Sequence, residues 1–364
     1  MTPTVRLVQL GAGGVGRALL RQIVDNRERH AERLGIRFDV AAVTDRDGIA
    51  LAPSGLSDDE IQSLVQAKCD GGRLQDRPNG RPWQGDDAIL DELSAPAILI
   101  DATATDATIP LLLSARERNW GVVLANKIPL AGPLQTFDRL ASSPRTRFET
   151  TVAAALPVLS TLQTYLLDTG DRVKSARGCV SGTLNIVCRR LEAGETLSAI
   201  VHDARAHGHT EPDPREDLAG RDAARKALIL ARLMGHKLEY DDVEVEPLYP
   251  SEMDDLDVEA FMARLSELDV PYNELTKEAL VAGRSLRYII EVTPESCRAR
   301  LEQLDPDDEL LRPGASDSVV ALASERYREN SLIVRGMGSG PELTASGVLA
   351  DLLTLSAEMK HARA

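Results

Sequence analysis

An aspartate and a lysine stand one helical turn apart after a proline-rich acidic loop. The stretch HGHTEPDPREDLAGRDAARK, residues 207–226, leads into a segment with helical periodicity. At about 100° per residue, Asp222 and Lys226 share one stripe with Ile229, so both charges are expected in or beside an apolar wall. The pKa of a lysine in a partly dry cleft moves towards neutrality, which makes Lys226 a candidate proton carrier.

The same pair has a structural interpretation. An aspartate and a lysine at positions i and i+4 form an ion pair worth about 0.2–0.5 kcal/mol on a helix. Burying such a pair is a poor way to stabilise a fold, because both charges must leave water. The helix alone leaves both interpretations open. We expect Arg221, Arg225 and Arg232 of this helix on a separate, solvated face.

The loop before the helix favours a functional role. In TEPDP each proline fixes its own backbone and restricts its predecessor, so Glu211 is presented rigidly. Glu211, Asp217 and Asp222 are placed to converge on a cation such as a substrate ammonium. Asp213 and Glu216 fit an ordinary solvated acidic loop.

A glycine-rich turn near the N-terminus has the spacing of a dinucleotide site. The apolar run at residues 4–10 predicts a strand, GAGGVG follows at once, and a helix begins near Arg17. In this motif the first glycine permits the turn, the second admits a pyrophosphate and the third lets helix and strand pack closely. The expected cofactor contacts here are Gly11, Gly13, Gly14, Val15 and Gly16.

The pattern along the first part of the chain predicts an α/β fold with a parallel, doubly wound sheet. Expected strands lie at residues 4–10, 38–43, 96–103 and 121–126, with helices at 57–67 and 108–118. Asp45 ends the second strand, as suits the ribose of NAD, but Arg46 beside it suits the extra phosphate of NADP, so the choice stays open.

The order of the expected strands and helices changes near residue 148, where we place the start of a second domain. Expected there are a strand at 147–152, a helix at 156–170, a strand ending in RGCVSGTLN, helices up to residue 234, and strands at 286–292, 298–304, 318–324 and 331–336. A last helix at 342–359 closes the chain. The predicted domains are residues 1–147, 148–325 and 326–364.

Composition excludes several classes of function. The formal net charge of −15, without a basic stripe, disfavours nucleic acid and anionic membranes as partners. The sequence holds neither an export signal nor the roughly 20 consecutive apolar residues of a membrane span. Four widely spaced cysteines fit neither a disulfide framework nor a zinc site, so we expect a cytoplasmic protein.

Taken together, the motifs resemble homoserine dehydrogenase. The resemblance rests on GAGGVG, ANKIPLAG, ETTVAAALPVL, GCVSGTLN, GHTEPDPREDLAGRDAARK and GMGSGPELTASGVLADLL, which span nearly the whole chain in the family's order. It implies a Rossmann-type dinucleotide-binding domain, an α+β substrate and dimerisation domain, and a C-terminal helix returning to the first domain. The implied reaction interconverts L-homoserine and L-aspartate 4-semialdehyde with NAD or NADP, towards threonine and methionine.

The resemblance also implies roles for single residues. Lys226 would donate a proton during reduction, Glu211 and Asp222 would bind the amino acid, and Asp217 would support its ammonium. Lys127, after a sheet strand, matches a second functional lysine beside nicotinamide and substrate. Further implied cofactor contacts are Thr103, Gly208 and Gly338.

A sodium site and a dimer are implied by resemblance alone. The segment ETTVAAALP matches the family's sodium-binding segment, with ligands from Glu149, Val152, Ala154 and Leu156. Alanines 153 and 155 stand where the family often has glycine. A homodimer through the second domain is expected. The chain stops at its return helix, so we expect no threonine inhibition through the small-molecule-sensing ACT domain that some bacterial members carry.

Three other interpretations deserve comparison with the structure. An acylating semialdehyde dehydrogenase would need a cysteine nucleophile, and Cys179 is the candidate, although it fits better as a small core residue. His202, His207 and His209 would suit a metal or base, but lack matching ligand spacing and fit partly solvated positions. A non-catalytic nicotinamide sensor would not need the pair Asp222 and Lys226.

Overall fold

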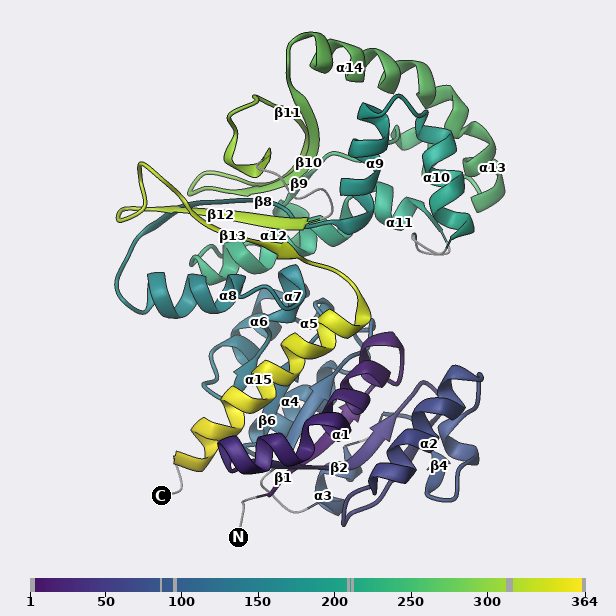
Figure 1. Cartoon of the computed structure of the whole chain (residues 1–364), viewed down its shortest axis with the longest axis vertical. Helices are drawn as coiled ribbons and strands as arrows, with labels where there is room; N and C mark the ends of the chain where they lie inside the picture. Colours follow the sequence, from purple (N-terminus) through teal and green to yellow (C-terminus); the bar gives the residue numbers. More distant parts are fainter. Residues whose placement is uncertain are drawn as a thin grey trace. The chain divides into compact units, whose positions relative to one another are not determined.

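The structure is a computed structural model that describes residues 4–85, 87–93, 97–207, 210, 213–311 and 317–361. Contacts divide the chain into two compact units, Met1–Leu156 with Ser339–Ala364, and Pro157–Gly338 (Figure 1). The functional boundaries expected after residues 147 and 325 stay a prediction. Within the described ranges, no helix is both long and apolar enough to cross a membrane.

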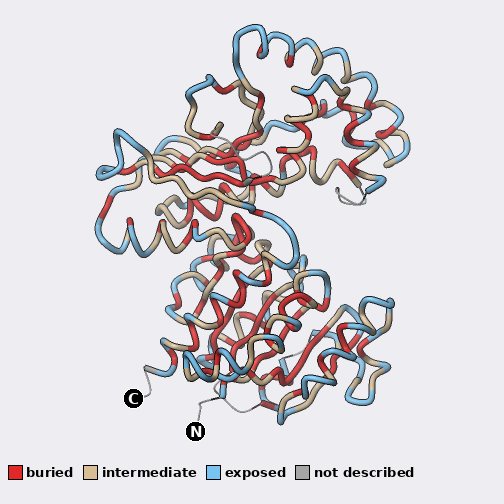
Figure 2. Tube along the Cα trace, viewed as in Figure 1, coloured by how far each residue is buried: buried red, intermediate tan, exposed pale blue. Residues whose placement is uncertain are grey.

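The first unit is built on a seven-stranded sheet in the order β4-β3-β2-β1-β5-β6-β7. Its strands are β1 (Thr4–Leu10), β2 (Arg37–Thr44), β3 (Gly48–Leu51), β4 (Gly80–Pro82), β5 (Ala97–Asp101), β6 (Gly121–Leu124) and β7 (Thr146–Arg147). The five neighbouring strands β2, β1, β5, β6 and β7 all pair in parallel. The central strands are continuous apolar runs because helices cover both of their faces, and they are buried throughout β5 and β6 (Figure 2).

Helices pack on both faces of this sheet. They are α1 (Gly14–Leu34), α2 (Asp58–Cys69), α3 (Ala88–Glu92), α4 (Ile109–Glu117), α5 (Ile128–Ala131), α6 (Leu134–Ala141), α7 (Thr150–Ala153) and α15 (Pro341–His361), with the short turn η1 (Leu74–Asp76). From β1 the chain moves one way along the sheet to β2, and from β5 the other way to β6. Right-handed crossovers therefore place α1 and α4 on opposite faces, and the expected doubly wound fold is confirmed.

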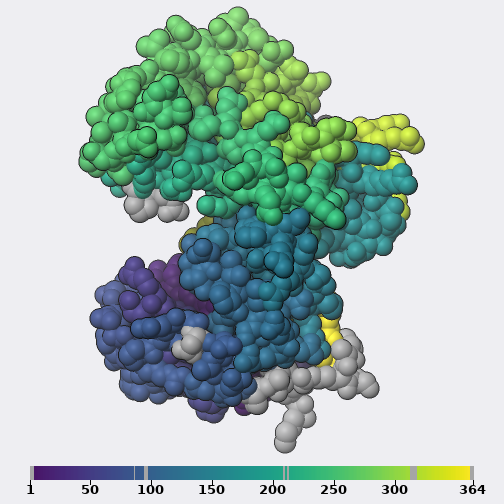
Figure 3. Space-filling model, turned by 180° about the vertical axis from the view of Figure 1, so that it is seen from behind, coloured from purple at the N-terminus to yellow at the C-terminus, as the bar shows by residue number. Residues whose placement is uncertain are grey.

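The sheet also has an antiparallel hairpin that the sequence did not predict. Strand β3 pairs antiparallel with β2 and with β4, at the edge beyond β2. Both strands are short and lack alternation, so periodicity gave no signal for them. In the space-filling view, the indigo and blue atoms of this inserted segment cover one side of the first unit (Figure 3).

The expected strand at residues 147–152 is wrong beyond its first residue. Only Thr146–Arg147 is a strand, and Thr150–Ala153 is a helical turn. The hydroxyls of the two threonines hold this turn, one by a hydrogen bond to the backbone three residues earlier and one by a hydrogen bond to the end of β6. The Thr151 hydroxyl donates to the Phe148 carbonyl at 2.8 Å, and the Thr150 hydroxyl to the Leu124 carbonyl at 3.3 Å.

The second unit contains a six-stranded sheet in the order β13-β12-β8-β10-β11-β9. Its strands are β8 (Val173–Cys179), β9 (Glu244–Val245), β10 (Ser285–Val292), β11 (Cys297–Leu304), β12 (Asp317–Ser324) and β13 (Leu332–Met337). All pairs are antiparallel except β11 with β9. Apart from β9, these strands match the expected ones, because their apolar runs are long and well separated.

Helices α9 and α12 pack against the central strand β10 of this sheet. The α-helices of the unit are α8 (Val158–Ser160), α9 (Gly182–Glu192), α10 (Leu197–Ala206), α11 (Arg215–Leu218), α12 (Arg221–Leu233), α13 (Val258–Arg264) and α14 (Asp269–Val281). A π-helix, η2 (Thr161–Leu167), follows α8, and the short 3-10 helices are η3 (Tyr240–Asp242), η4 (Ser251–Met253), η5 (Leu265–Leu268) and η6 (Glu309–Leu311). The motif SGTLN, expected at a strand end, instead begins α9.

The last helix belongs to the first unit, where α15 lies beside α1 (Figure 1). Gly347 of α15 passes close to the turn after β7. A Cβ atom at Gly347 would lie 2.5 Å from the Thr150 Cγ2 atom and 2.9 Å from the Ala155 Cα atom. Close packing therefore requires glycine here, although glycine disfavours a helix interior.

We predict that Gly347→Ala lowers the unfolding midpoint of the protein. Alanine favours a helix interior over glycine by about 1 kcal/mol, but overpacking a tight core costs about 1–3 kcal/mol. Thermal and urea unfolding measure the balance. The control is Ser346→Ala, because Ser346 is an exposed neighbour on the same helix. A Gly347→Ala protein more stable than wild type would contradict the close packing of α15.

Candidate active site

The glycine loop after β1 has the geometry that its spacing predicts. Gly11 has φ +94°, and a Cβ there would lie 2.7 Å from the Ala102 carbonyl oxygen. A Cβ at Gly16 would overlap the Gly11 carbonyl oxygen, whereas a Cβ at Gly13 would meet nothing within 4 Å. Gly11 and Gly16 therefore serve the turn and the helix contact. Gly13 leaves open space in front of the N-terminus of α1, where a phosphate binds favourably.

A buried glutamine in β1 stabilises this loop through hydrogen bonds. Gln9 is 1 % exposed, and its side-chain amide donates to the carbonyl oxygens of Gly11 at 2.9 Å and Gly16 at 3.1 Å. It thus joins the end of β1 to the first turn of α1. We did not single out Gln9 from the sequence, although a lone polar residue in an apolar strand before a glycine loop is a usable signal.

The loop opens onto a pocket of about 1,100 Å³ in the first unit. Its walls come from the glycine loop, from Thr44–Arg46 after β2, from Ala102–Thr105 after β5, and from Trp83 of the inserted hairpin segment. Glycines shape one wall, an open helix N-terminus faces the cavity, and the volume suits a large ligand. These residues fit a nicotinamide dinucleotide.

The acidic residue after β2 is already engaged. Asp45 accepts a hydrogen bond from the Lys68 ammonium at 2.8 Å and from the backbone N–H groups of Asp47 and Gly48 at 3.0 and 2.9 Å. Burial opposes ionisation of Asp45, but these donors outweigh it, and its pKa lies below the usual value. Arg46 beside it has a side chain that is 92 % exposed.

A buried aspartate joins the ends of β5 and β6. Asp101 accepts from the Thr103 hydroxyl at 2.7 Å, the Thr108 hydroxyl at 2.7 Å and the Asn126 amide at 3.1 Å. Burial raises the pKa of Asp101, and these hydrogen bonds oppose that rise. The network fixes Thr103 and Asn126, and Lys127 follows directly as the residue that precedes α5. Two expected site residues are thereby brought to neighbouring strand ends.

In the second unit, the lysine and aspartate of α12 form the expected pair. The Lys226 ammonium donates to the Asp222 carboxylate at 2.7 Å and to the Val180 carbonyl oxygen at 2.6 Å. The Lys226 side chain is 11 % exposed and that of Asp222 is 40 % exposed. The mostly buried ammonium is therefore held between α12 and the residue after β8.

The start of α12 is fixed by a buried tyrosine. Gly220 precedes the helix with φ +68°, and a Cβ there would overlap the Tyr288 hydroxyl. That hydroxyl donates to the carbonyl oxygens of Glu246 at 2.9 Å and Ala299 at 3.1 Å. The sequence did not indicate this contact, because Tyr288 lies on β10, far along the chain.

An arginine ties the acidic loop to the following segment. Arg215 donates to the Asp213 carboxylate at 2.7 Å and to the carbonyl oxygens of Asp254 at 2.7 Å and Leu256 at 2.5 Å. Its guanidinium lies 5.4 Å from the ring centroid of Phe261. Arg215 begins α11, so these bonds also fix the short helix that carries Asp217, a half-buried residue.

Other expected site residues cannot be placed. Gly208, His209 and Glu211 lie outside the described residues. Gly338 is described and buried, and a Cβ there would overlap the Ser318 hydroxyl. The structure therefore gives Gly338 a packing role in the second unit.

The expected solvated face of α12 is wrong for one residue. Arg221 is exposed, but the Arg232 side chain is fully buried. The chain after α12 folds back over it, and Arg232 donates to the Leu238 carbonyl at 3.0 Å and to the Glu239 carboxylate at 3.1 Å. Periodicity within one helix cannot reveal such a cover.

The cysteine and histidine alternatives gain no support. Cys179 is 3 % exposed, and burial raises its pKa to about 12, so its thiol is protonated and inert. His202 and His207 are exposed. Among the described residues, no group of three or more histidine, cysteine, aspartate or glutamate side chains is arranged to hold a metal.

The segment expected to bind sodium forms a tight turn in the first unit. The Glu149 backbone N–H donates to the Asp351 carboxylate at 3.0 Å. Val152 and Ala154 are buried, and Ala154 has φ +50°, a conformation that costs an alanine energy. The Leu156 N–H donates to the Ala153 carbonyl at 3.1 Å, which closes the turn.

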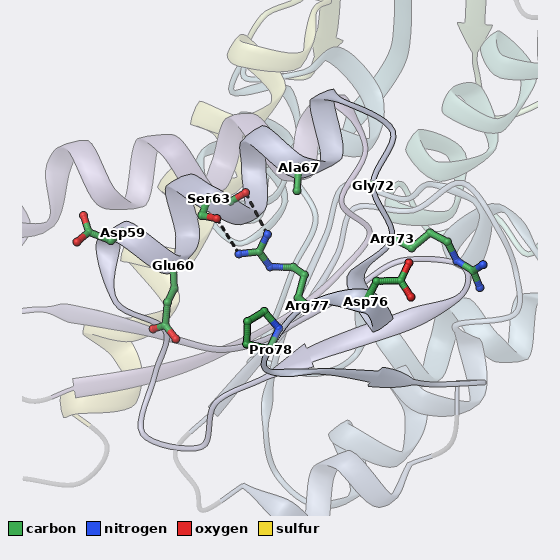
Figure 4. A pocket seen from close by; sticks show the side chains of 9 residues that line it. All are labelled: Asp59, Glu60, Ser63, Ala67, Gly72, Arg73, Asp76, Arg77 and Pro78. Atoms are coloured by element: carbon green, nitrogen blue, oxygen red, sulfur yellow. Dashed lines mark hydrogen bonds between the residues drawn. The ribbon is translucent and has the colours of Figure 1, made fainter.

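A second hollow of about 550 Å³ lies on the surface beside α2. It is lined by Asp59, Glu60, Ser63, Ala67, Gly72, Arg73, Asp76, Arg77 and Pro78 (Figure 4). Arg77 is bound to Ser63, through the carbonyl at 3.1 Å and the hydroxyl at 3.0 Å (Figure 4). The remaining charges are of mixed sign, and we assign no ligand to this hollow.

Comparisons with family models and with known proteins all indicate the same family. The model described as homoserine dehydrogenase matches residues 157–353, and the one described as homoserine dehydrogenase, NAD binding domain, matches residues 11–148. A homoserine dehydrogenase of Paracoccidioides brasiliensis is 31 % identical over 373 residues, covering 96 % of this chain and 97 % of that protein.

Some relatives are much longer. A chloroplastic bifunctional aspartokinase/homoserine dehydrogenase of Zea mays is 31 % identical over 95 % of this chain, which spans 38 % of that protein. Among solved structures, a hyperthermophilic archaeal homoserine dehydrogenase in complex with NADPH covers 98 % of both chains with a TM-score of 0.76 and 22 % identity. That likeness shows a common fold.

We predict that Gln9→Leu weakens NADPH binding about ten-fold, because two buried hydrogen bonds worth about 0.5–1.5 kcal/mol each would be lost under the glycine loop. NADPH fluorescence titration measures the dissociation constant. Gln66→Leu is the control, since Gln66 is an exposed glutamine on α2. Unchanged NADPH affinity in a folded Gln9→Leu protein would show that the loop needs no brace.

Proposed function

Because the chain belongs to the homoserine dehydrogenase family, we propose that it interconverts L-homoserine and L-aspartate 4-semialdehyde with a nicotinamide dinucleotide, on the route to threonine and methionine. The observation that carries the proposal is the mostly buried Lys226 ammonium, which donates to Asp222 and to the Val180 carbonyl. A sensor that only binds nicotinamide gains nothing from such a group.

Lys226 is the proton donor in this proposal. The reduced cofactor, when bound, supplies a hydride to the aldehyde carbon. Negative charge then develops on the aldehyde oxygen, and an adjacent ammonium stabilises it and delivers the proton. Asp222 and the Val180 carbonyl orient that ammonium, because each accepts one of its N–H bonds. In the oxidation direction, Lys226 accepts the hydroxyl proton of homoserine.

The acidic residues around α11 and α12 bind the amino acid in this proposal. Asp222 and Glu211 contact the substrate, and Asp217 supports its ammonium. Asp217 is held near the start of α12 by the Arg215 contacts, which supports this assignment. Lys127 is the second functional lysine, and its support is its position directly after Asn126 of the Asp101 network.

The first unit holds the cofactor, and we propose that NADP is preferred over NAD. Gly11, Gly13, Gly14, Val15 and Thr103 line the pocket, and together with Gly16 they are the proposed contacts. Asp45 is engaged with Lys68 and its own turn, so it is less available to a ribose hydroxyl. The exposed Arg46 guanidinium lines the same pocket and suits the extra phosphate.

Three further proposals complete the assignment. A sodium ion binds at Glu149, Val152, Ala154 and Leu156, and the support for this site is the unusual backbone conformation of Ala154 within that segment. The protein is a homodimer assembled through its second domain. It works in the cytoplasm, which the four free cysteines support.

Lys226→Ala tests the reaction. We expect kcat for homoserine oxidation to fall by about 10²–10⁴-fold, the usual contribution of a general acid or base. NADPH affinity, measured by fluorescence, should stay at the wild-type value. Lys277→Ala on α14 is the matched control, because Lys277 is an exposed lysine of the same unit. A kcat near wild type in Lys226→Ala would sink the proposed role.

Arg46→Ala tests the cofactor preference. The variant should lose affinity for NADP and keep its affinity for NAD, so the ratio of kcat/KM values for NADP over NAD should fall about ten-fold or more through loss of a charge-assisted contact. Initial rates with both cofactors measure this ratio. Arg33→Ala, at an exposed arginine of α1, is the control. A ratio unchanged by Arg46→Ala would reject the phosphate contact.

A further inference from the structure

The inserted hairpin delivers a tryptophan to the dinucleotide pocket. The sequence holds two tryptophans, of which Trp120 is a core residue that is 3 % exposed. Trp83 directly follows β4, and β4 pairs with β3 so that Pro82 lies opposite Gly48. Gly48 closes the turn of Asp45 and Arg46 after β2. The strand register therefore brings Trp83 to the carboxyl end of β2, where it lines the pocket.

Trp83 lowers the stability of the fold through a polar group that phenylalanine or leucine would not have. Its indole N–H is buried and has no hydrogen-bond partner within the part of the chain that the structure describes. Buried tryptophans normally pair this group, and leaving it unpaired lowers stability. A phenylalanine or leucine would fill space without that cost. What tryptophan adds is a large, flat π face on a half-buried side chain.

The surroundings of Trp83 suit a flat base held by its faces. Ala104, Ala107 and Leu111 line the same pocket with small or apolar side chains. Two polar groups that line the pocket are already engaged, since the Thr108 hydroxyl donates to Asp101 and the Lys68 ammonium to Asp45. These two groups are not offered to the edge of a base, whereas the apolar side chains can contact its faces.

The order of pyrophosphate, ribose and adenine along a dinucleotide indicates which of these groups reaches Trp83. In this fold the pyrophosphate sits at the N-terminus of the first helix, and the adenosine ribose lies at the end of the second strand. Those positions are occupied here by Gly13 at the start of α1 and by Asp45 after β2. The adenine base extends past the ribose, to the place where the hairpin brings Trp83.

We propose that Trp83 is the stacking platform for the adenine base of the cofactor. The indole face binds the base by stacking, which tolerates any purine and needs no hydrogen bond to its edge. The inference depends on dinucleotide binding by the first unit and not on the proposed reaction. It gives the inserted β3–β4 segment a role in cofactor affinity.

Intrinsic fluorescence tests this proposal without catalysis. Trp120→Phe leaves Trp83 as the single tryptophan, so titration with 5′-AMP should quench its emission in a saturable way. Nicotinamide mononucleotide should leave that emission unchanged. In Trp83→Phe, the remaining Trp120 emission should not respond to 5′-AMP. If Trp120→Phe does not fold, the difference between the wild-type and Trp83→Phe titrations gives the same curve.

Affinity supplies the second readout. Trp83→Ala should raise the dissociation constants of 5′-AMP and NADPH by the same factor, about ten-fold, with Trp83→Phe between it and wild type. Gln66→Ala is the control, since Gln66 is an exposed residue of α2 outside this pocket. The ligand-free melting temperature should not fall in Trp83→Phe, because this variant keeps an aromatic ring and removes the unpaired donor.

Three results would overturn the assignment. They are a 5′-AMP titration that leaves Trp83 emission unchanged, wild-type 5′-AMP affinity in Trp83→Ala, and quenching of Trp83 by nicotinamide mononucleotide as strong as that by 5′-AMP. Absence of homoserine oxidation in the wild-type protein would count against the proposed reaction alone, because every measurement above follows binding.

Discussion

A charged ammonium that is mostly removed from water must be paired, and this requirement organises the second unit. Lys226 is 11 % exposed, and among the described residues its ammonium donates to a carboxylate of α12 and to the carbonyl that follows β8. Both partners must be held at bonding distance, so the start of α12 needs a fixed position. Tyr288 fixes it through Gly220, and Arg215 fixes the loop before it. The surrounding packing therefore serves one side chain.

The first unit positions its ligand groups in the same way, through buried polar side chains. Gln9 holds the glycine loop from within β1, and Asp101 joins the ends of β5 and β6. Gln9 and Asp101 each lie in a strand, where the backbone is rigid. Each forms hydrogen bonds with residues of a loop that lines the pocket. Loops anchored like this can present Thr103 and Lys127 reproducibly, whereas free loops would lose that precision on thermal motion.

The sequence predicted what depends on local pattern and missed what depends on distant segments. Central strands, the glycine loop and the stripe shared by Asp222 and Lys226 follow from periodicity within a few residues. The burial of Arg232 depends on a later segment folding back, and the brace of Gly220 depends on Tyr288. The turn at Thr150 was mistaken for a strand because threonine favours strands, yet its hydroxyl also bonds to backbone. Trp83 gave no signal, since only the β3–β4 register brings it to the pocket.

The magnitude of ion-pair energies supports the catalytic role that we propose for Asp222 and Lys226. A pair on a helix surface contributes about 0.2–0.5 kcal/mol, whereas removing an ammonium from water costs several kcal/mol unless its partners compensate. A hydrophobic residue at position 226 would stabilise the helix packing at no such cost. Stability alone therefore does not explain a lysine at this place in the fold. The Asp222 side chain is 40 % exposed, so the pair is open to solvent on one side, where a substrate can approach. An ammonium that is dry on one side and reachable on the other is suited to passing a proton to an alkoxide, and poorly suited to holding a fold together.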